Sequence, residues 1–289
     1  MPPVKNRKPK GSFKLFPRGA RKSGIDAAAS PVVRAKPRRG IYLLPNAFTT
    51  AALFCGFYAI VMAMNQEWER SCFAVFMAAV LDSLDGRVAR MTNTQSEFGA
   101  QYDSLSDMVS FGVAPALIAY EWALKGMGKW GWLAAFVYCA GAALRLARFN
   151  TNIAVVDKRY FQGIPSPAAA ALVVGFILLM QDLAIAGETV RWFAFTVTLF
   201  AGLTMVTNVP FYSFKDVNLK RSVPFVAPLI VVCIYVALVS DPHKVLFGLF
   251  VGYALSGYLV LLWRWRNGRP VSLVQMTHDE DTEHDELGG

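Results

Sequence analysis

The sequence contains little histidine and little cysteine, which removes several kinds of chemistry. Its three histidines, His243, His278 and His284, fall in expected loops or in the C-terminal tail. A histidine general base or a histidine metal site inside an apolar bundle is therefore excluded. No cysteine pair has the C-x-x-C spacing of a zinc or redox site. The cysteines lie in apolar runs, where we expect them to pack as small apolar residues: Cys55, Cys72, Cys139 and Cys233.

Charge is also scarce. Only 17% of the residues are charged, against 55% that are apolar, and the mean hydropathy is +0.37. Soluble domains carry about 25% charged residues, so a soluble fold is excluded. The sequence also lacks a G-x-S-x-G nucleophile turn and a full-length phosphate-binding loop of the Walker type. These absences argue against a serine hydrolase and a P-loop nucleotidase, and no organic cofactor is expected.

Apolar windows of membrane-spanning length follow one another along most of the chain. They predict an all-α polytopic membrane protein with about eight transmembrane helices. We expect the spans at roughly 41–64, 71–90, 103–124, 130–150, 167–187, 191–212, 223–240 and 245–266.

Charged residues gather at the two ends of the chain. Residues 1–40 hold twelve Lys or Arg against one acidic residue, Asp26. We expect this arm to be disordered and to lie on anionic membrane lipid rather than on nucleic acid. Residues 268–289 form an acidic tail, to which we assign no chemistry. Between them we expect a six-helix catalytic core over 41–212 and two additional helices over 213–267.

The distribution of Lys and Arg between the expected loops predicts the orientation. With eight spans, the side that holds the basic arm receives twelve further Lys or Arg and the other side receives five. Cytoplasmic loops carry the excess of Lys and Arg, so both termini are expected in the cytoplasm. The compact loops and the lack of a transit peptide favour a bacterial inner (plasma) membrane.

Four aspartates lie at the ends of two expected helices. Asp82 and Asp85 are three residues apart, and Asp103 and Asp107 are four apart, so each pair projects from one helix face. The polar connection between the helices folds them back on each other, which brings the four carboxylates together near the cytoplasmic boundary. Like charges packed at membrane depth are costly. A hard divalent cation such as Mg²⁺, Mn²⁺ or Ca²⁺ would offset that cost.

The spacing around these aspartates resembles a known signature. The fixed residues follow the pattern D-x₂-D-G-x₂-A-R-x₈-G-x₃-D-x₃-D, with Asp82, Asp85, Gly86, Ala89, Arg90, Gly99, Asp103 and Asp107. This pattern is similar to that of the CDP-alcohol phosphotransferase family at every fixed position. The resemblance implies a six-helix membrane core in which an alcohol hydroxyl displaces CMP from a CDP-linked donor.

The resemblance also implies roles for the four carboxylates. Asp82, Asp85 and Asp103 would hold one or two divalent metal ions, Mg²⁺ or Mn²⁺, with Ca²⁺ as a further option. These ions would neutralise the donor pyrophosphate. Asp107 would act as the general base and would also be placed to bind metal. No covalent nucleophile is needed.

Several other residues are candidates for binding the donor. Gly86 and Gly99 leave room for a ligand beside the acids, although helix packing also favours small residues. Arg90 is placed to meet a phosphate or to cap its helix. Asn46 and Thr49 lie in the stretch LPNAFT, which looks like the family's entry motif and would lie near the cytidine. The same stretch is also a good helix start.

Two further stretches bear on the acceptor alcohol. Arg145 and Arg148 lie three apart at a helix end, where they can grip a carboxylate or phosphate or serve as topology determinants. The run R-x₂-R-F-N, which ends at Asn150, and the run F-x-G-I-P-S-P-A-A-A resemble the phosphatidylserine synthase branch of the family, with Ile164 where Leu is usual. This resemblance implies CDP-diacylglycerol and L-serine as substrates, CMP and phosphatidylserine as products, and Arg145, Arg148 and Asn150 as serine or phosphate ligands.

Other functions compete with this interpretation. A sister enzyme that uses inositol, glycerol phosphate or choline would share the aspartate pattern. A divalent-cation or proton-coupled transporter would also carry intramembrane carboxylates. Transporters tend to place charges at the membrane midplane within repeats, whereas these aspartates lie at one end of their helices. The sequence is compatible with a homodimer and does not require one.

Overall fold

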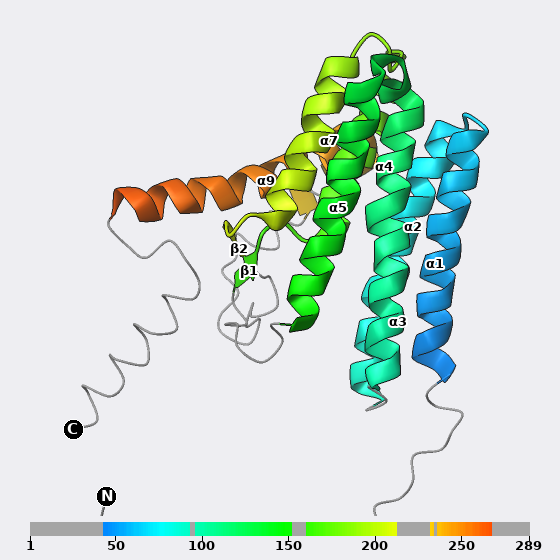
Figure 1. The fold of residues 1–289 in the computed structure, drawn as a ribbon, viewed down its shortest axis with the longest axis vertical. Coiled ribbons are helices and arrows are strands. Elements are labelled where there is room, and N and C mark those ends of the chain that lie inside the picture. Colours follow the sequence, from blue (N-terminus) through cyan, green and yellow to red (C-terminus); the bar gives the residue numbers. More distant parts are fainter. Residues whose placement is uncertain (1–42, 93–95, 152–159, 213–231, 234–235, 268–289) are drawn as a thin grey trace, which may run out of the picture. The chain divides into compact units, whose positions relative to one another are not determined.

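The computed structural model describes residues 43–92, 96–151, 160–212, 232–233 and 236–267. The described elements are helices, apart from one short pair of strands (Figure 1). The long helices are α1 (Leu43–Met64), α2 (Trp68–Met91), α3 (Glu97–Asp107), α5 (Lys129–Thr151), α6 (Ser166–Asp182), α7 (Arg191–Val206) and α9 (Pro242–Arg266). The expected all-α polytopic class is confirmed.

Helices α1 and α2 form a tight hairpin that brings the Asp82 end of α2 beside the start of α1 (Figure 1). The chain reverses at Gln66, whose φ of 62° lies in the left-handed region. The buried Ser71 hydroxyl donates to the Ala59 carbonyl at 2.7 Å and ties the two helices together near this turn. The hairpin is therefore fixed at the end away from the aspartates.

The third helical run is continuous from Glu97 to Leu124, but it is not a uniform α-helix. Ser96 caps its start, because its hydroxyl accepts from the Gly99 N–H at 3.0 Å. After α3 come the π-helical turn η1 (Met108–Val113), α4 (Ala114–Ala119), a second π-helical turn η2 (Tyr120–Leu124) and the short 3₁₀ turn η3 (Lys125–Met127). The Tyr138 hydroxyl donates to the Phe111 carbonyl in η1 at 3.0 Å. The irregular turn directly follows Asp107, and π-turns are frequent at functional sites.

Helices α5 and α7 cross closely at two glycines, Gly141 and Gly202. A Cβ atom added at Gly141 would collide with the Gly202 carbonyl, and one added at Gly202 would lie 2.6 Å from the Tyr138 Cα. Glycine is needed here because the two backbones touch.

A short two-stranded pair joins the segment before α6 to the segment after α7. Strand β1 (Tyr160–Gln162) runs antiparallel to β2 (Pro210–Tyr212). Gly163 follows β1 with φ 76°, and a Cβ atom there would collide with the Met205 carbonyl. Only glycine adopts this conformation at so close an approach. The entry to α6 is therefore fixed against the end of α7.

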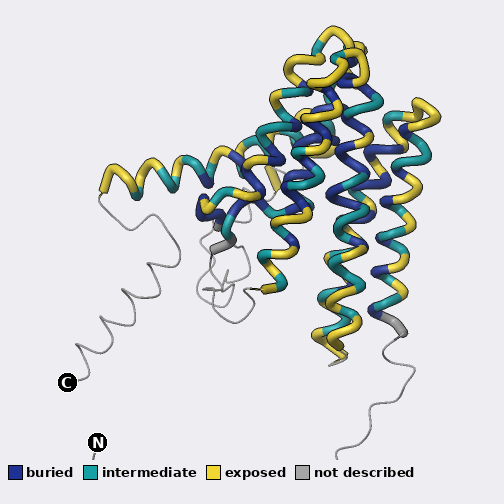
Figure 2. Tube along the Cα trace, in the orientation of Figure 1, coloured by how far each residue is buried: buried dark blue, intermediate teal, exposed yellow. Residues whose placement is uncertain are grey.

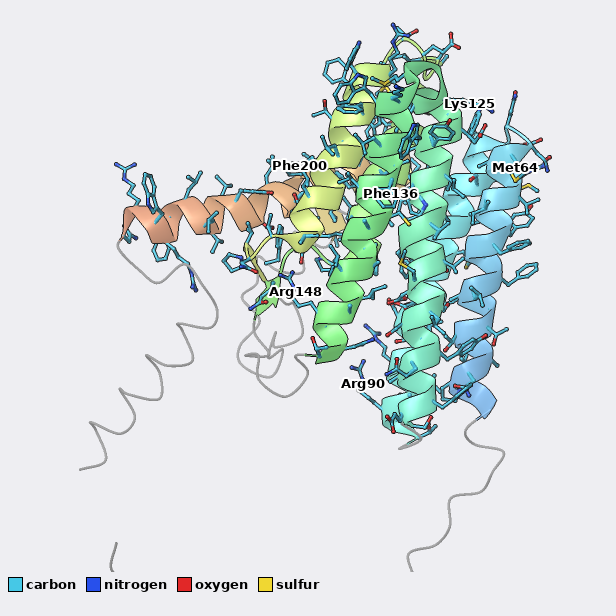
Figure 3. All side chains as sticks on the ribbon, in the orientation of Figure 1. Met64, Arg90, Lys125, Phe136, Arg148 and Phe200 are labelled. Carbon is cyan, nitrogen blue, oxygen red and sulfur yellow. The ribbon has the colours of Figure 1, made fainter. Side chains whose placement is uncertain are left out.

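The helices differ in how far they are buried. Helix α6 is the most enclosed of the long helices, with residues 169–178 buried, while the residues of α9 are exposed or half-buried apart from Ala254 and Gly257 (Figure 2). The exposed positions carry large apolar side chains, such as Met64 at 71% and Phe136 at 60% exposure (Figure 3). An apolar exterior of this kind suits a lipid environment. By length and composition, α1 from Pro45, α5 and α9 are each able to cross a membrane.

The helix bounds depart from the expected spans at several ends. Helix α6 ends at Asp182, five residues early, because Ala184 takes a left-handed φ of 54°. Helix α7 ends at Val206, where the chain turns extended at Thr207 and leads into β2. The third run begins at Glu97, six residues early, because Ser96 caps it. The expected arm, the tail and most of the seventh span, 223–240, lie outside the described residues.

Candidate active site

The four aspartates come from two neighbouring helices. Asp82 and Asp85 lie in the last half of α2, and Asp103 and Asp107 lie in α3. Carboxylate oxygens of Asp82, Asp85 and Asp103 all lie within 4.8 Å of one another. The Asp82 carboxyl is within hydrogen-bonding reach of both Asp103 and Asp107. The folded chain thus gathers the four carboxylates that the spacing predicts to be close.

The carboxylate cluster fits a hard divalent cation. Its donors are oxygens alone, which Mg²⁺ and Mn²⁺ prefer. The Asp103 Oδ1 atom is buried and has no hydrogen-bond partner in the described part of the chain. By contrast, Asp85 Oδ2 accepts from the Thr49 hydroxyl at 2.8 Å. A buried carboxylate oxygen without a partner is costly, and a cation would remove that cost.

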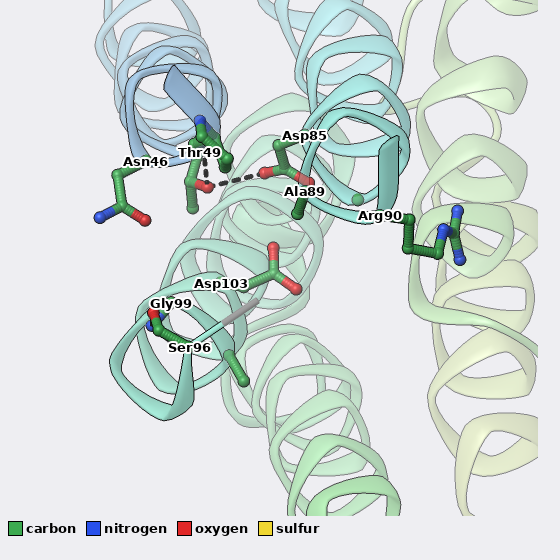
Figure 4. Close-up of a pocket in the computed structure, with 11 residues that line it drawn as sticks. Asn46, Thr49, Asp85, Ala89, Arg90, Ser96, Gly99 and Asp103 are labelled. Carbon is green, nitrogen blue, oxygen red and sulfur yellow. Dashed lines mark hydrogen bonds between the residues drawn. The ribbon is translucent and has the colours of Figure 1, made fainter. Parts of the chain in front are cut away.

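A cavity of about 300 Å³ opens beside the cluster (Figure 4). Its walls come from the start of α1, the end of α2 and the start of α3. Seven candidate site residues line it, together with Ala89 of the signature: Asn46, Thr49, Asp85, Gly86, Arg90, Gly99 and Asp103. The volume lies at the low end of the range for small-molecule sites. Of the expected donor-binding residues, Asp82 alone is not in the lining, although it belongs to the carboxylate cluster.

Two of the lining residues had alternative interpretations. A Cβ atom added at Gly86 would meet no heavy atom within 4 Å in the described part of the chain, so packing does not require this glycine. Arg90 is exposed, and Figure 4 shows its side chain directed away from Asp85 and Asp103. The space at Gly86 therefore belongs to the cavity, and Arg90 lies at its rim.

Arg145 lies on α5, near its C-terminal end. Its Nη1 atom donates to the hydroxyl of the buried Ser166 at 2.7 Å, and its charge acts on Asp107. Its Nε atom is buried with no partner among the described residues. Arg145 therefore keeps one buried donor for an anionic ligand.

Arg148 and Asn150 are engaged in protein contacts instead. Both Nη atoms of Arg148 donate within 3.3 Å, to the carbonyls of Gln162, Met205, Val206 and Thr207 and to the Asn208 side chain. The Asn150 amide donates to the Ser104 hydroxyl at 3.0 Å, which joins the end of α5 to α3. Of the three residues expected to bind serine or phosphate, Arg145 alone has a buried donor left over.

Comparison with known proteins shows the family to which the chain belongs. A family model described as CDP-alcohol phosphatidyltransferase matches residues 42–204, more than half of the sequence. The chain belongs to the CDP-alcohol phosphatidyltransferase family. The matched range includes the carboxylate cluster, the cavity, Arg145 and α6. The resemblance that the aspartate spacing indicated is thus confirmed.

Three relatives of the chain are each described as CDP-diacylglycerol--serine O-phosphatidyltransferase. The relative from Helicobacter pylori is 38% identical over 229 residues, which cover 78% of this chain and 95% of the relative. The relative from Methanocaldococcus jannaschii is 31% identical and covers 76% and 95%. The relative from Mycobacterium tuberculosis is 30% identical and covers 81% and 84%.

Some residues of this family site were missed by the sequence reasoning. Ser96 and Ala100 line the cavity from variable positions of the family signature, and Ser166 contacts Arg145 from the start of α6. A serine directly before an expected helix is a capping signal, and Ser166 directly precedes the span expected from residue 167. That signal does not reveal its partner Arg145, which is 21 residues away in the sequence, and Ser96 lies seven residues before the expected helix start at 103, where no such signal applies.

Proposed function

We propose that this protein transfers the phosphatidyl group of CDP-diacylglycerol to the hydroxyl of L-serine and releases CMP, forming phosphatidylserine. The observation that carries the proposal is the cavity lined by the family's signature residues, directly beside three carboxylates within 4.8 Å of one another. The descriptions of the relatives support serine as the acceptor.

The cluster would hold one or two divalent ions, Mg²⁺ or Mn²⁺. Asp82, Asp85 and Asp103 are the ligands, and Asp107 is close enough to Asp82 to assist. When bound, the metal neutralises the pyrophosphate of the donor and the charge that develops on CMP. The unpartnered oxygen of Asp103 supports this assignment.

The donor lies in the cavity with its cytidine toward Asn46 and Thr49. Asp107 accepts the proton from the serine hydroxyl. The serine oxygen then forms a bond to the phosphorus that carries diacylglycerol, and the bond from this phosphorus to the oxygen bridging to CMP breaks. CMP leaves with the bridging oxygen and its electron pair. The products are phosphatidylserine, CMP and one proton, so atoms and charge balance.

Arg145 supplies the cation that the serine carboxylate needs. Its buried Nε donor has no protein partner in the described residues, and its charge acts on Asp107, the proposed base. A zwitterionic acceptor held here would bring its hydroxyl toward the base. Arg148 is already occupied by carbonyl groups, so it is a weaker candidate for this contact.

The reaction takes place at the cytoplasmic face of a bacterial inner membrane, with both termini in the cytoplasm. Arg90 and Arg148 lie at the same end of the bundle as the site, while Lys125 lies at the other (Figure 3). The predominance of Lys and Arg in the loops on the site's side supports this orientation. The core over 41–212 would carry the chemistry, with the basic arm on anionic lipid.

One assay tests the proposal. Purified protein is mixed with CDP-diacylglycerol and a panel of alcohols, and CMP release is measured with Mg²⁺, with Mn²⁺ and after EDTA treatment. We expect serine to be the fastest acceptor, serinol to be poor because it lacks the carboxylate, and EDTA to abolish the rate. Faster release with inositol or glycerol phosphate would refute the serine assignment. Full activity in EDTA would refute the metal site.

A further inference from the structure

The residue that fixes Arg145 lies on a different helix. Ser166 is the first residue of α6, it is fully buried, and its hydroxyl accepts from Arg145 Nη1 at 2.7 Å. This bond occupies the Nη1 atom of the guanidinium. The neighbouring Nε–H is left buried and unpaired within the described residues. Because a guanidinium is planar and rigid, holding Nη1 also fixes the direction in which Nε–H points.

Ser166 is itself held by the segment that precedes it. The Gly163 N–H donates to the Val209 carbonyl at 2.9 Å, and β1 pairs with β2. The Arg148 Nη2 atom donates to the Gln162 carbonyl at 3.1 Å, in the same segment. These contacts join residues 160–166 to the end of α7. The start of α6 therefore cannot shift without breaking several hydrogen bonds.

Arg148 is the centre of this attachment. Its guanidinium bridges β1, the last turn of α7 and Asn208. Arg145 and Arg148 lie one turn apart on α5. Arg148 thus fixes the segment that carries Ser166, and Ser166 fixes Arg145.

We propose that Ser166 is a positioning residue that holds the guanidinium of Arg145 in place, and that Arg148 supports it by fixing residues 160–166 against α7. That Arg145 binds the serine carboxylate rests on the proposed function; that Ser166 positions Arg145 does not. The two statements are therefore tested by different measurements.

The first measurement does not depend on activity. Arg145 in the intact protein is modified with phenylglyoxal, and labelling of its peptide is followed by mass spectrometry. We expect Ser166→Ala to speed labelling several-fold, because the guanidinium loses its partner. Asn208→Ala, which removes one acceptor of Arg148, should have a smaller effect in the same direction.

The matched control is Ser71→Ala, which removes an equally buried 2.7 Å bond at the far end of α2. Equal labelling in Ser166→Ala and wild type would overturn the positioning role.

The second measurement is kinetic and uses CMP release. We expect Ser166→Ala to raise the KM for serine by about five- to thirtyfold and to leave the KM for CDP-diacylglycerol within about twofold. In an Arg145→Lys background, Ser166→Ala should add no further change, because Ser166 acts only through Arg145. Additive effects would overturn the inference.

Faster labelling with an unchanged serine KM would keep the positioning role and refute Arg145 as the carboxylate ligand. A wild type that releases no CMP with serine would refute the proposed function, while the labelling result still decides the positioning role.

Discussion

At the scale of the residue, the carboxylates of the site differ in which partners they already have. Asp85 is buried and accepts a hydrogen bond from Thr49, whereas Asp103 has a buried oxygen without a partner among the described residues. The charge of Arg145, the proposed ligand of the serine carboxylate, acts on Asp107. Residues of one type in one cluster therefore have different expected roles.

Replacing Asp107 by Asn should abolish turnover and leave donor binding largely intact. The amide keeps the size of the side chain but cannot accept the proton, while Asp82, Asp85 and Asp103 remain. CMP release and CDP-diacylglycerol binding are measured separately. Asp241→Asn, at an exposed carboxylate before α9, is the control and should leave both unchanged. Full activity in Asp107→Asn would exclude it as the base.

Replacing Thr49 by Val should weaken metal binding through Asp85. The hydroxyl that donates to Asp85 Oδ2 at 2.8 Å is lost at nearly constant volume. Groups that orient a metal ligand typically contribute about ten- to a hundredfold to metal affinity, so the Mg²⁺ concentration for half-maximal rate should rise by that factor. Thr49→Ser keeps the hydroxyl and should stay near wild type. If Thr49→Val and Thr49→Ser need the same Mg²⁺ concentration for half-maximal rate, the hydrogen bond to Asp85 does not contribute to metal affinity.

At the scale of the element, the acceptor side of the site depends on how α5 meets α7. Arg145 and Arg148 lie on α5, and the carbonyls that Arg148 binds lie at the end of α7. The two helices approach closely enough for this only because Gly141 and Gly202 face each other. This close crossing accompanies the contact of the Arg148 side chain with the last turn of α7.

Replacing Gly202 by Ala should therefore destabilise the protein. The new methyl group would lie 2.6 Å from the Tyr138 Cα, which forces the helices apart. Overpacking of this kind costs about 1 to 3 kcal/mol, so the Tm in detergent should fall by several degrees. Gly252→Ala on α9 is the matched control, because a Cβ there meets nothing within 4 Å in the described residues. An unchanged Tm for Gly202→Ala would contradict the close crossing.

At the scale of the whole molecule, the two ends of the bundle have different chemistry. The carboxylate cluster, the cavity and the arginines lie at one end, and the α6–α7 connection near Glu188 lies at the other. A lipid-linked donor and a water-soluble acceptor meet where the helices leave the bilayer, so the polar end must face the compartment that supplies serine.

The orientation predicts different labelling of the two ends in intact cells. With a membrane-impermeant maleimide added outside, Glu188→Cys should be labelled and Thr92→Cys should be labelled only after permeabilisation. Both positions are exposed. The parent chain, with its four native cysteines, gives the background signal. Labelling of Thr92→Cys from outside would reverse the proposed orientation.

The sequence by itself determined the membrane class, the order of the helices and the carboxylate cluster. Apolar runs of spanning length leave the chain few alternatives to helix in a bilayer. Spacings of three and four residues place Asp82 with Asp85 and Asp103 with Asp107 on single helix faces, whatever the helices pack against. The cavity residues near Asp85 were expected from the resemblance to the family's signature and entry motif, and they lie on the same hairpin or at the adjacent start of α1.

The tertiary structure alone decided the roles of the two arginines and the ends of α6 and α7. Arg145 and Arg148 look equivalent on α5, and they differ only because α7 brings its carbonyls to Arg148 while α6 brings Ser166 to Arg145. The end of α7 likewise depends on β2 pairing with β1, about 50 residues away. Such partners are distant in the chain, and helix spacing specifies only which side chains share a face, not which neighbour that face meets.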